Sequence, residues 1–229
     1  MVEGIRAVAF DVDGTMYPTH KFYFRVWPYY LKNFKFFFYF SKVRKELHRK
    51  AKENPCLAGQ NFYDDQAALL AQKMKISKEA AGQLIEKICY KGLLKYYVSL
   101  PTYPDLLDLM YEIKARGFKV AILSDFPLEQ KGNLWGVSDI CDVLLGAENC
   151  GALKPSKVPF EVLADQLGLE PWQVLYVGNS KKYDVEGAKN AGMKSALKLK
   201  GFRKLFSLPC KESDISFTDY RQLRKIVLE

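Results

Sequence analysis

The apolar residues at positions 7–10 are followed directly by Asp11-Val12-Asp13-Gly14-Thr15. Strand-forming residues that end in two carboxylates and a glycine predict a buried strand that gives way to a loop at Asp11. Side chains alternate along an extended chain, so Asp11 and Asp13 are expected to project to the same side. Two carboxylates this close repel each other unless a cation or a proton lies between them. The segment therefore predicts a metal ion, a shared proton, or both.

Two other interpretations of this segment can be weighed from the residues. An EF-hand calcium loop that begins at Asp11 needs Gly at its sixth position and Glu at its twelfth. These positions hold Met16 and Phe22, which excludes a calcium loop. A polar turn without a chemical role stays open at this point.

Apolar runs and helix-terminating residues alternate along the rest of the chain. Strands are predicted at about 5–11, 119–124, 143–145, 174–178 and 195–199, and helices at about 105–116, 159–168 and 218–227. Residues 17–99 form an insertion that is expected to be helical, since Ser77 is a good N-cap and is followed by apolar residues at helical spacing. The alternation predicts an α/β fold with a parallel sheet and helices on both faces.

Polar residues follow the predicted strands in three further places. Ser124-Asp125 ends the run 119–123, Lys154-Pro155 precedes a helical pattern, and Gly178-Asn179-Ser180 ends the run 174–177, with Asp184 soon after. In this order, DVDGT, the strand ending in Ser, Lys-Pro and GNSxxxD resemble the four signature motifs of the haloacid dehalogenase superfamily, in its phosphatase branch. The resemblance covers about residues 5–200, of which 16–100 match only in length.

The resemblance implies a Rossmann-like architecture. Its parallel sheet would have the strand order 5-4-1-2-3, with the first strand central, and would belong to a catalytic core of residues 1–16 and 100–229. Residues 17–99 would be a helical cap that closes over the site and sets the choice of substrate.

The resemblance also implies a role for each motif residue. Asp11 would be the nucleophile that forms an aspartyl-phosphate intermediate, and Asp13 the general acid and base. Lys154 would offset the charge of the transition state, and Ser124 would hydrogen-bond a phosphoryl oxygen. Asp125 stands where the family often has Asn; we include it among the candidate phosphate-binding residues, although an extended chain points it away from Ser124.

Magnesium is the implied cofactor, because it is a hard ion that prefers oxygen ligands. The candidate ligands are Asp11, the main-chain carbonyl of Asp13, Asp184 and Asn179. The family usually carries an acidic residue where this chain has Asn179. Since one negative charge is missing there, we expect weaker metal binding or a greater dependence on Asp184.

These motifs favour a phosphatase that acts on a small phosphorylated metabolite, but other activities stay open. A haloacid dehalogenase would use the same nucleophile, and enzymes of that branch typically carry Tyr where this chain has Asp13. A phosphomutase would keep both carboxylates and the metal. If the motifs were inactive, a non-enzymatic interaction protein would be the main alternative.

Residues 21–50, here called the basic aromatic segment, hold nine Lys or Arg and one acid, Glu46, for a local charge of +8 against +9 for the whole chain. On a helical wheel one face is apolar and another is basic. The apolar face holds Phe36, Phe40, Val43 and Leu47, and the basic face holds Lys32, Lys35, Lys42, Lys45 and Arg49. The segment could pack its aromatics inward, attract an anionic substrate, rest on an anionic membrane surface or form a dimer contact. No specific nucleic acid is expected, because no recognition motif accompanies the charge.

The remaining composition suits a cytoplasmic enzyme. Five cysteines are scattered without paired metal spacing, which is typical of a reducing compartment. The first strand begins so near Met1 that no signal peptide is expected. The two histidines, His20 and His48, are expected on the surface rather than as ligands.

Overall fold

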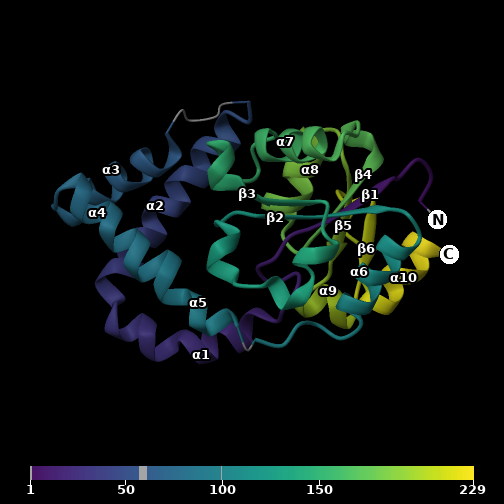
Figure 1. Ribbon diagram of the computed structural model, residues 1–229, viewed down its shortest axis with the longest axis horizontal. Coiled ribbons are helices and arrows are strands. Elements are labelled where there is room, and N and C mark those ends of the chain that lie inside the picture. Colours follow the sequence, from purple (N-terminus) through teal and green to yellow (C-terminus); the bar gives the residue numbers. More distant parts are fainter. Residues whose placement is uncertain (1, 57–60, 99) are drawn as a thin grey trace.

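The computed structural model describes residues 2–56, 61–98 and 100–229. Its centre is a six-stranded parallel sheet with the order β3-β2-β1-β4-β5-β6 (Figure 1). The five predicted strands are present in the predicted order, which confirms the Rossmann-like class. The strands are β1 (Ala7–Phe10), β2 (Lys119–Ser124), β3 (Val143–Gly146), β4 (Val174–Gly178), β5 (Lys194–Lys198) and β6 (Ile215–Phe217).

The sixth strand, β6, was not predicted from the sequence. It has three residues and pairs with β5 through Ala196 and Ile215, and the Leu199 amide donates to the Phe217 carbonyl (2.8 Å). A run of three residues carries too little periodicity to be distinguished from a loop. The sheet therefore extends one strand beyond the expected edge.

Alternate residues of β1 face two different helical layers. Val8 and Phe10 belong to one buried cluster together with residues of α6 (Leu106–Ala115) and α10 (Tyr220–Leu228). Ala7 and Ala9 belong to the other, with residues of α7 (Val158–Leu167) and α8 (Glu186–Asn190). Figure 1 shows these pairs of helices on opposite sides of the sheet. The central strand is thus buried on both faces, which fixes the position of its carboxyl end.

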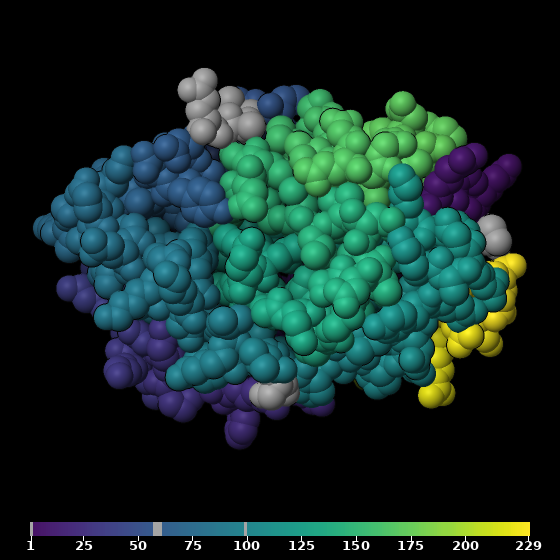
Figure 2. Space-filling model, in the orientation of Figure 1, coloured from purple at the N-terminus to yellow at the C-terminus, as the bar shows by residue number. Residues whose placement is uncertain are grey.

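A helical insertion lies between β1 and α6 in the sequence and beyond one end of the sheet in space (Figure 1). Ser77 caps α4 as predicted, because its side chain accepts a hydrogen bond from the Ala80 amide (3.1 Å). In Figure 2 the insertion packs directly against the part of the chain that carries the sheet. Its helices are α1 (Thr19–Lys32), α2 (Phe34–Glu53), α3 (Phe62–Met74), α4 (Lys78–Leu84), the π-helical turn η1 (Ile85–Lys91) and α5 (Gly92–Tyr97).

The basic aromatic segment forms α1 and α2 with two distinct faces. All four predicted apolar residues of α2 are buried, and all five residues of the basic face are exposed. Arg44 departs from the predicted pattern, since this cation is only 8% exposed. On α1, Phe24 is 86% exposed, and Trp27 and Leu31 are also exposed. Phe36 and Phe40 therefore pack inward along α2, whereas Phe24 and Trp27 on α1 remain open to solvent. Each helix also has the opposite case, since Phe22 on α1 is buried and Phe34 on α2 is exposed.

Two general expectations can be checked on the described residues. None of their helices is long and apolar enough to cross a membrane. All five cysteines lie among them with free thiols: Cys56, Cys89, Cys141, Cys150 and Cys210.

Candidate active site

Asp11 is positioned by the register of the central strand. Its amide donates to the Val177 carbonyl (2.9 Å), so it directly continues the pairing of β1 with β4. The side chain is buried, with the residue 5% exposed. Gly14 then turns the chain with φ +87°, a left-handed conformation that glycine adopts without strain. The turn leaves Asp11 at the carboxyl end of the sheet, where ligands bind in open α/β folds.

Lys154 joins two buried carboxylates. Its Nζ lies 2.7 Å from Asp11 Oδ1 and 2.8 Å from Asp184 Oδ1. Burial, and then the charge of Asp184, raise the pKa of Asp11 to about 7, although Lys154 opposes this. Burial would lower the pKa of Lys154, but the two carboxylates outweigh it and hold that pKa well above its usual value. Lys154 is therefore charged and offsets the negative charge of Asp11 and Asp184.

Asp184 is held by the backbone of the loop after β4. Its Oδ2 accepts hydrogen bonds from the amides of Asn179 (2.9 Å) and Ser180 (2.8 Å). Gly178 makes this approach possible, because a Cβ there would lie 2.3 Å from the Asp184 Cβ. Gly178 in the predicted motif thus allows Asp184 to pack closely against the backbone.

Asp13 has a cationic partner that the sequence did not reveal. Lys131 Nζ lies 2.8 Å from both carboxylate oxygens, and the Tyr17 hydroxyl also donates to Asp13. Burial alone would raise the pKa of Asp13, but Lys131 outweighs it and lowers the pKa. Lys131 belongs to a short 3₁₀ turn (Leu128–Lys131) that carries no motif. No local pattern could have identified it.

Asn179 donates its amide to the Asp13 carbonyl, which the prediction assigned to a metal, and to the Thr15 hydroxyl. Its Nδ2 lies 2.7 Å from the Asp13 carbonyl and 2.9 Å from Thr15 Oγ1, while Lys200 donates to its Oδ1. The Lys200 ammonium can only donate, so it fixes which end of the amide faces Asp13. To coordinate a cation, Asn179 would have to turn its amide and leave Lys200.

The donor chemistry of the cavity suits a hard cation such as magnesium. Its lining includes four carboxylates, on Asp11, Asp13, Asp125 and Asp184, against one lysine and one arginine, while Lys131, which is not part of the lining, pairs with Asp13. A divalent cation would offset this excess of negative charge. Within residues 2–56, 61–98 and 100–229, no three His, Cys, Asp or Glu side chains converge into a metal cage. An ion here would therefore also need the Asp13 carbonyl, the Asn179 amide or water.

Ser124 and Asp125 diverge at the end of β2. Ser124 is fully buried, its hydroxyl accepts from the Phe126 amide (3.2 Å), and it does not belong to the cavity lining, so its contact with phosphate stays a prediction. Asp125 lines the cavity, accepts from the Lys154 amide (3.1 Å) and lies 3.6 Å from His48 Nε2. An anionic side chain is a poor phosphate ligand, and these contacts favour a positioning role. The expectation that His48 lies on the surface is wrong; its side chain is 12% exposed.

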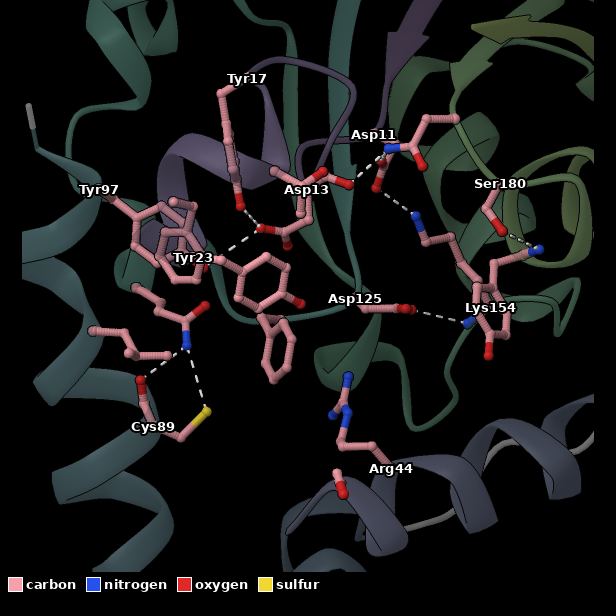
Figure 3. Close-up of a pocket in the computed structure, with 18 of the residues that line it drawn as sticks. Asp11, Asp13, Tyr17, Tyr23, Arg44, Cys89, Tyr97, Asp125, Lys154 and Ser180 are labelled. Atoms are coloured by element: carbon pink, nitrogen blue, oxygen red, sulfur yellow. Dashed lines mark hydrogen bonds and ion pairs between the residues drawn. The ribbon is translucent and has the colours of Figure 1, made fainter. Parts of the chain in front are cut away.

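A cavity of about 400 Å³ lies between the sheet and the helical insertion, and its lining includes Asp11, Asp13, Asp125, Lys154, Asn179 and Asp184. Asp11 and Lys154 lie at one end, and Arg44 reaches toward it from α2 (Figure 3). The sequence did not indicate most of the aromatic wall, because its residues come from the insertion and match no motif, while Phe126 and Tyr183 come from outside it. The aromatic walls include Tyr17, Phe22, Tyr23, Tyr30, Phe37, Phe40, Tyr97, Phe126 and Tyr183.

Comparison with known proteins places this geometry in context. The sequence model of the haloacid dehalogenase-like hydrolases matches residues 5–192. The phosphoglycolate phosphatase of Aquifex aeolicus is 34% identical over 89% of each chain. The glyceraldehyde 3-phosphate phosphatase of Methanopyrus kandleri is 27% identical over 82% of each chain. The match to the phosphoglycolate phosphatase of Haemophilus influenzae strain 86-028NP covers 57% of that enzyme's length.

Solved structures share the whole fold. A HAD phosphatase from Thermococcus onnurineus superposes with a TM-score of 0.61 at 22% identity, over 97% of each chain. The L-2-haloacid dehalogenase of Xanthobacter autotrophicus gives 0.64 at 19% identity, over 97% of this chain and 98% of its own. At these identities the likeness concerns the fold and does not separate the two chemistries.

Proposed function

Since this chain belongs to the haloacid dehalogenase-like hydrolases, we propose that it hydrolyses the phosphate ester of a small metabolite through an aspartyl-phosphate intermediate, with magnesium as cofactor. The observation that carries the proposal is the convergence of Asp11, Asp13, Lys154 and Asp184 on one cavity. These residues come from three separate parts of the chain, and each is placed by strand register, a tight turn or an ion pair.

In the first step the Asp11 carboxylate attacks phosphorus. A bond forms between its oxygen and phosphorus, the ester P–O bond breaks, and the leaving alcohol takes a proton from Asp13. In the second step water attacks the same phosphorus, Asp13 takes its proton, and the bond to Asp11 breaks to release inorganic phosphate. Lys154 stays beside Asp11 and offsets charge throughout.

Asp13 must carry a proton before it can act as an acid. In the described contacts Lys131 keeps it ionised. A phosphate group bound beside Asp13 adds negative charge and so raises its proton affinity. Lys131 and Tyr17 then act as positioning residues that hold the carboxyl toward the cavity.

The candidate magnesium ligands are Asp11, the Asp13 carbonyl, Asp184 and Asn179. When bound, magnesium supplies positive charge to the phosphoryl oxygens. All four of these residues line the cavity.

The substrate is proposed from the relatives. Their names specify phosphoglycolate and glyceraldehyde 3-phosphate, which are both short phosphate monoesters. We propose a compound of this size class.

The test is hydrolysis of p-nitrophenyl phosphate, with and without magnesium, by the wild type and by Asp11→Asn. The variant is expected to lose more than about a thousandfold in kcat while its circular dichroism is retained, because the nucleophile is gone. Asp13→Asn should lose more activity on an alkyl phosphate than on the nitrophenyl ester, whose leaving group needs little protonation. Unchanged turnover in Asp11→Asn would falsify the proposal.

The rival chemistries give different products. A haloacid dehalogenase would release chloride from 2-chloropropionate, and a phosphomutase would yield an isomeric sugar phosphate instead of inorganic phosphate. Chloride release by the wild type without phosphatase activity would replace our proposal with dehalogenation.

We also propose that α1 rests on an anionic membrane surface. Phe24, Trp27 and Leu31 recur at helical spacing and are 86%, 59% and 57% exposed, within a segment of net charge +8. The full-length protein should co-sediment with vesicles that contain phosphatidylserine at low salt, and less so at high salt or with Phe24→Ser/Trp27→Ser. Equal binding to vesicles with and without phosphatidylserine would contradict this surface assignment. A dimer in sedimentation velocity that does not respond to salt would also contradict it.

A further inference from the structure

Two buried polar atoms in the cavity wall have no hydrogen-bond partner. Among the described residues, the buried side-chain nitrogen and oxygen atoms without a partner are Arg44 Nη2 and Gln130 Oε1. Arg44 is 8% exposed and Gln130 is 2% exposed. Both residues line the cavity that holds Asp11. Buried groups of this kind are rare in folded proteins and point to a missing ligand or water.

The guanidinium of Arg44 is fixed by contacts on one side. Its Nη1 donates to Gln66 Oε1 (3.0 Å) and to Glu148, and its Cζ lies 4.2 Å from the centre of the Phe126 ring. These contacts leave Nη2 as a free charged donor. In Figure 3 the guanidinium points from α2 toward the cavity and Asp125.

Gln130 is fixed in the same manner. Its Nε2 donates to the Cys89 carbonyl (2.9 Å). A carbonyl can only accept, so the amide cannot be reversed without loss of this bond. Its Oε1 therefore remains a neutral acceptor at the cavity.

Arg44 Nη2 and Gln130 Oε1 together indicate which chemical groups a ligand of this cavity carries. Lys154 and Arg44 are the cations that line the described cavity. Lys154 Nζ is engaged by both Asp11 and Asp184, whereas the ion pair of Arg44 with Glu148 uses Nη1 and leaves Nη2 without a partner. An anionic group remote from the phosphate would thus find Arg44 as its partner. A planar guanidinium edge suits a carboxylate, and a neutral carbonyl acceptor suits a hydroxyl.

We infer that the substrate is a phosphorylated hydroxy acid whose carboxylate binds Arg44 and whose hydroxyl donates to Gln130. This inference rests on the proposed phosphatase function and assigns both residues to substrate choice. A site with buried polar atoms rejects analogues that leave those atoms unpaired.

Four phosphate esters separate the two contacts. Ethyl phosphate has neither group, glycerol 1-phosphate has hydroxyls alone, phosphoglycolate has a carboxylate alone, and 3-phosphoglycerate has both. The wild type should prefer 3-phosphoglycerate in kcat/KM. The carboxylate, which meets the charged Arg44, should add about 10- to 100-fold to kcat/KM. The hydroxyl, which meets the neutral Gln130, should add less.

For each variant, the quantity compared is the ratio of kcat/KM between two esters, measured on the same protein. Arg44→Lys should reduce the ratio of phosphoglycolate to ethyl phosphate by about tenfold or more, and Gln130→Met should reduce the ratio of glycerol 1-phosphate to ethyl phosphate. If Arg44→Lys fails to fold, Arg44→Met/Glu148→Gln removes both charges of the buried pair together. Arg49→Met and Gln72→Met, at exposed positions of α2 and α3, are the matched controls and should keep the ratios.

A general loss of folding would lower all four rates together and leave the ratios unchanged, which would contradict the assignment. Equal wild-type rates on all four esters would also overturn it and indicate that water satisfies both atoms. Hydrolysis of p-nitrophenyl phosphate in that case would leave the phosphatase proposal intact. Absence of that hydrolysis would contradict the phosphatase proposal itself.

Discussion

The carboxyl end of β1 and the helices α1 and α2 are both rich in charged side chains, but these are paired and buried in the first region and mostly exposed in the second. At the end of β1, Lys154 and Lys131 are each buried against carboxylates at 2.7 to 2.8 Å. On α1 and α2 most cations face solvent, and the helices are held by buried aromatics. The first region depends on ion pairs, and the second depends on apolar packing.

Loss of Lys154 should produce the largest effect in the first region. Lys154→Met would leave Asp11 and Asp184 buried without their shared cation, and breaking a buried pair costs about 3–5 kcal/mol. We expect a lower midpoint in urea and loss of phosphatase activity. Magnesium should restore part of the stability, because it can compensate the same two carboxylates.

Lys157→Met serves as the control, since that lysine forms a partly exposed pair with Glu161. It should change stability by less than about 1 kcal/mol. Equal midpoints for the two variants would show that the site does not depend on its buried ion pair.

The packing of α2 should respond to an uncharged substitution. Phe36 is 3% exposed and stacks on Phe40 with ring centres 5.2 Å apart. Phe36→Ala is expected to cost about 3–4 kcal/mol in urea unfolding, because it creates a cavity. Phe24→Ala removes the same side chain from a position 86% exposed and should change stability by less than about 0.5 kcal/mol. Similar losses in both would mean that α1 is covered in solution.

The same contrast explains what could be predicted. Asp11 and Asp13 were found because they directly follow a strand, and strand ends in a parallel sheet meet at one edge. Lys154 and Asp184 were found through the resemblance of their short motifs to those of the family. The buried face of α2 followed from its period of 3.6 residues.

The missed residues share a different origin. Arg44 and Gln130 line the cavity, and Lys131 contacts Asp13 over a sequence separation of 118 residues. All three are placed by contacts between segments that are distant in the sequence. Periodicity correctly placed Phe36 and Phe40 inside but gave no reason to bury Arg44. Its burial depends on Glu148, far away in the sequence.

Asn179→Asp tests the position where this chain departs from its family. The change adds a carboxylate beside Asp11 and removes the amide donated to the Asp13 carbonyl (2.7 Å). Magnesium should bind about tenfold more tightly, or about 1.4 kcal/mol, in titration calorimetry. Without the ion the variant should melt below the wild type. Asn149→Asp adds the same charge at an exposed position and is the control; an equal gain there would exclude Asn179 as a ligand.

Lys198 on β5 is a buried lysine without the carboxylates that surround Lys154. It is 3% exposed, and its Nζ lies 3.5 Å from the centre of the Tyr103 ring. Burial, together with Lys204 and Lys200, lowers its pKa to about 8. Between pH 8 and 10.5 the unfolded chain therefore binds more protons than the folded one, so this group's contribution to stability rises with pH in that window. Lys198→Met should raise Tm by a few degrees at pH 7, and the gain should shrink as the pH rises through 8 toward 10. A gain that stays constant over this range would show that Lys198 has its ordinary pKa and an unseen partner.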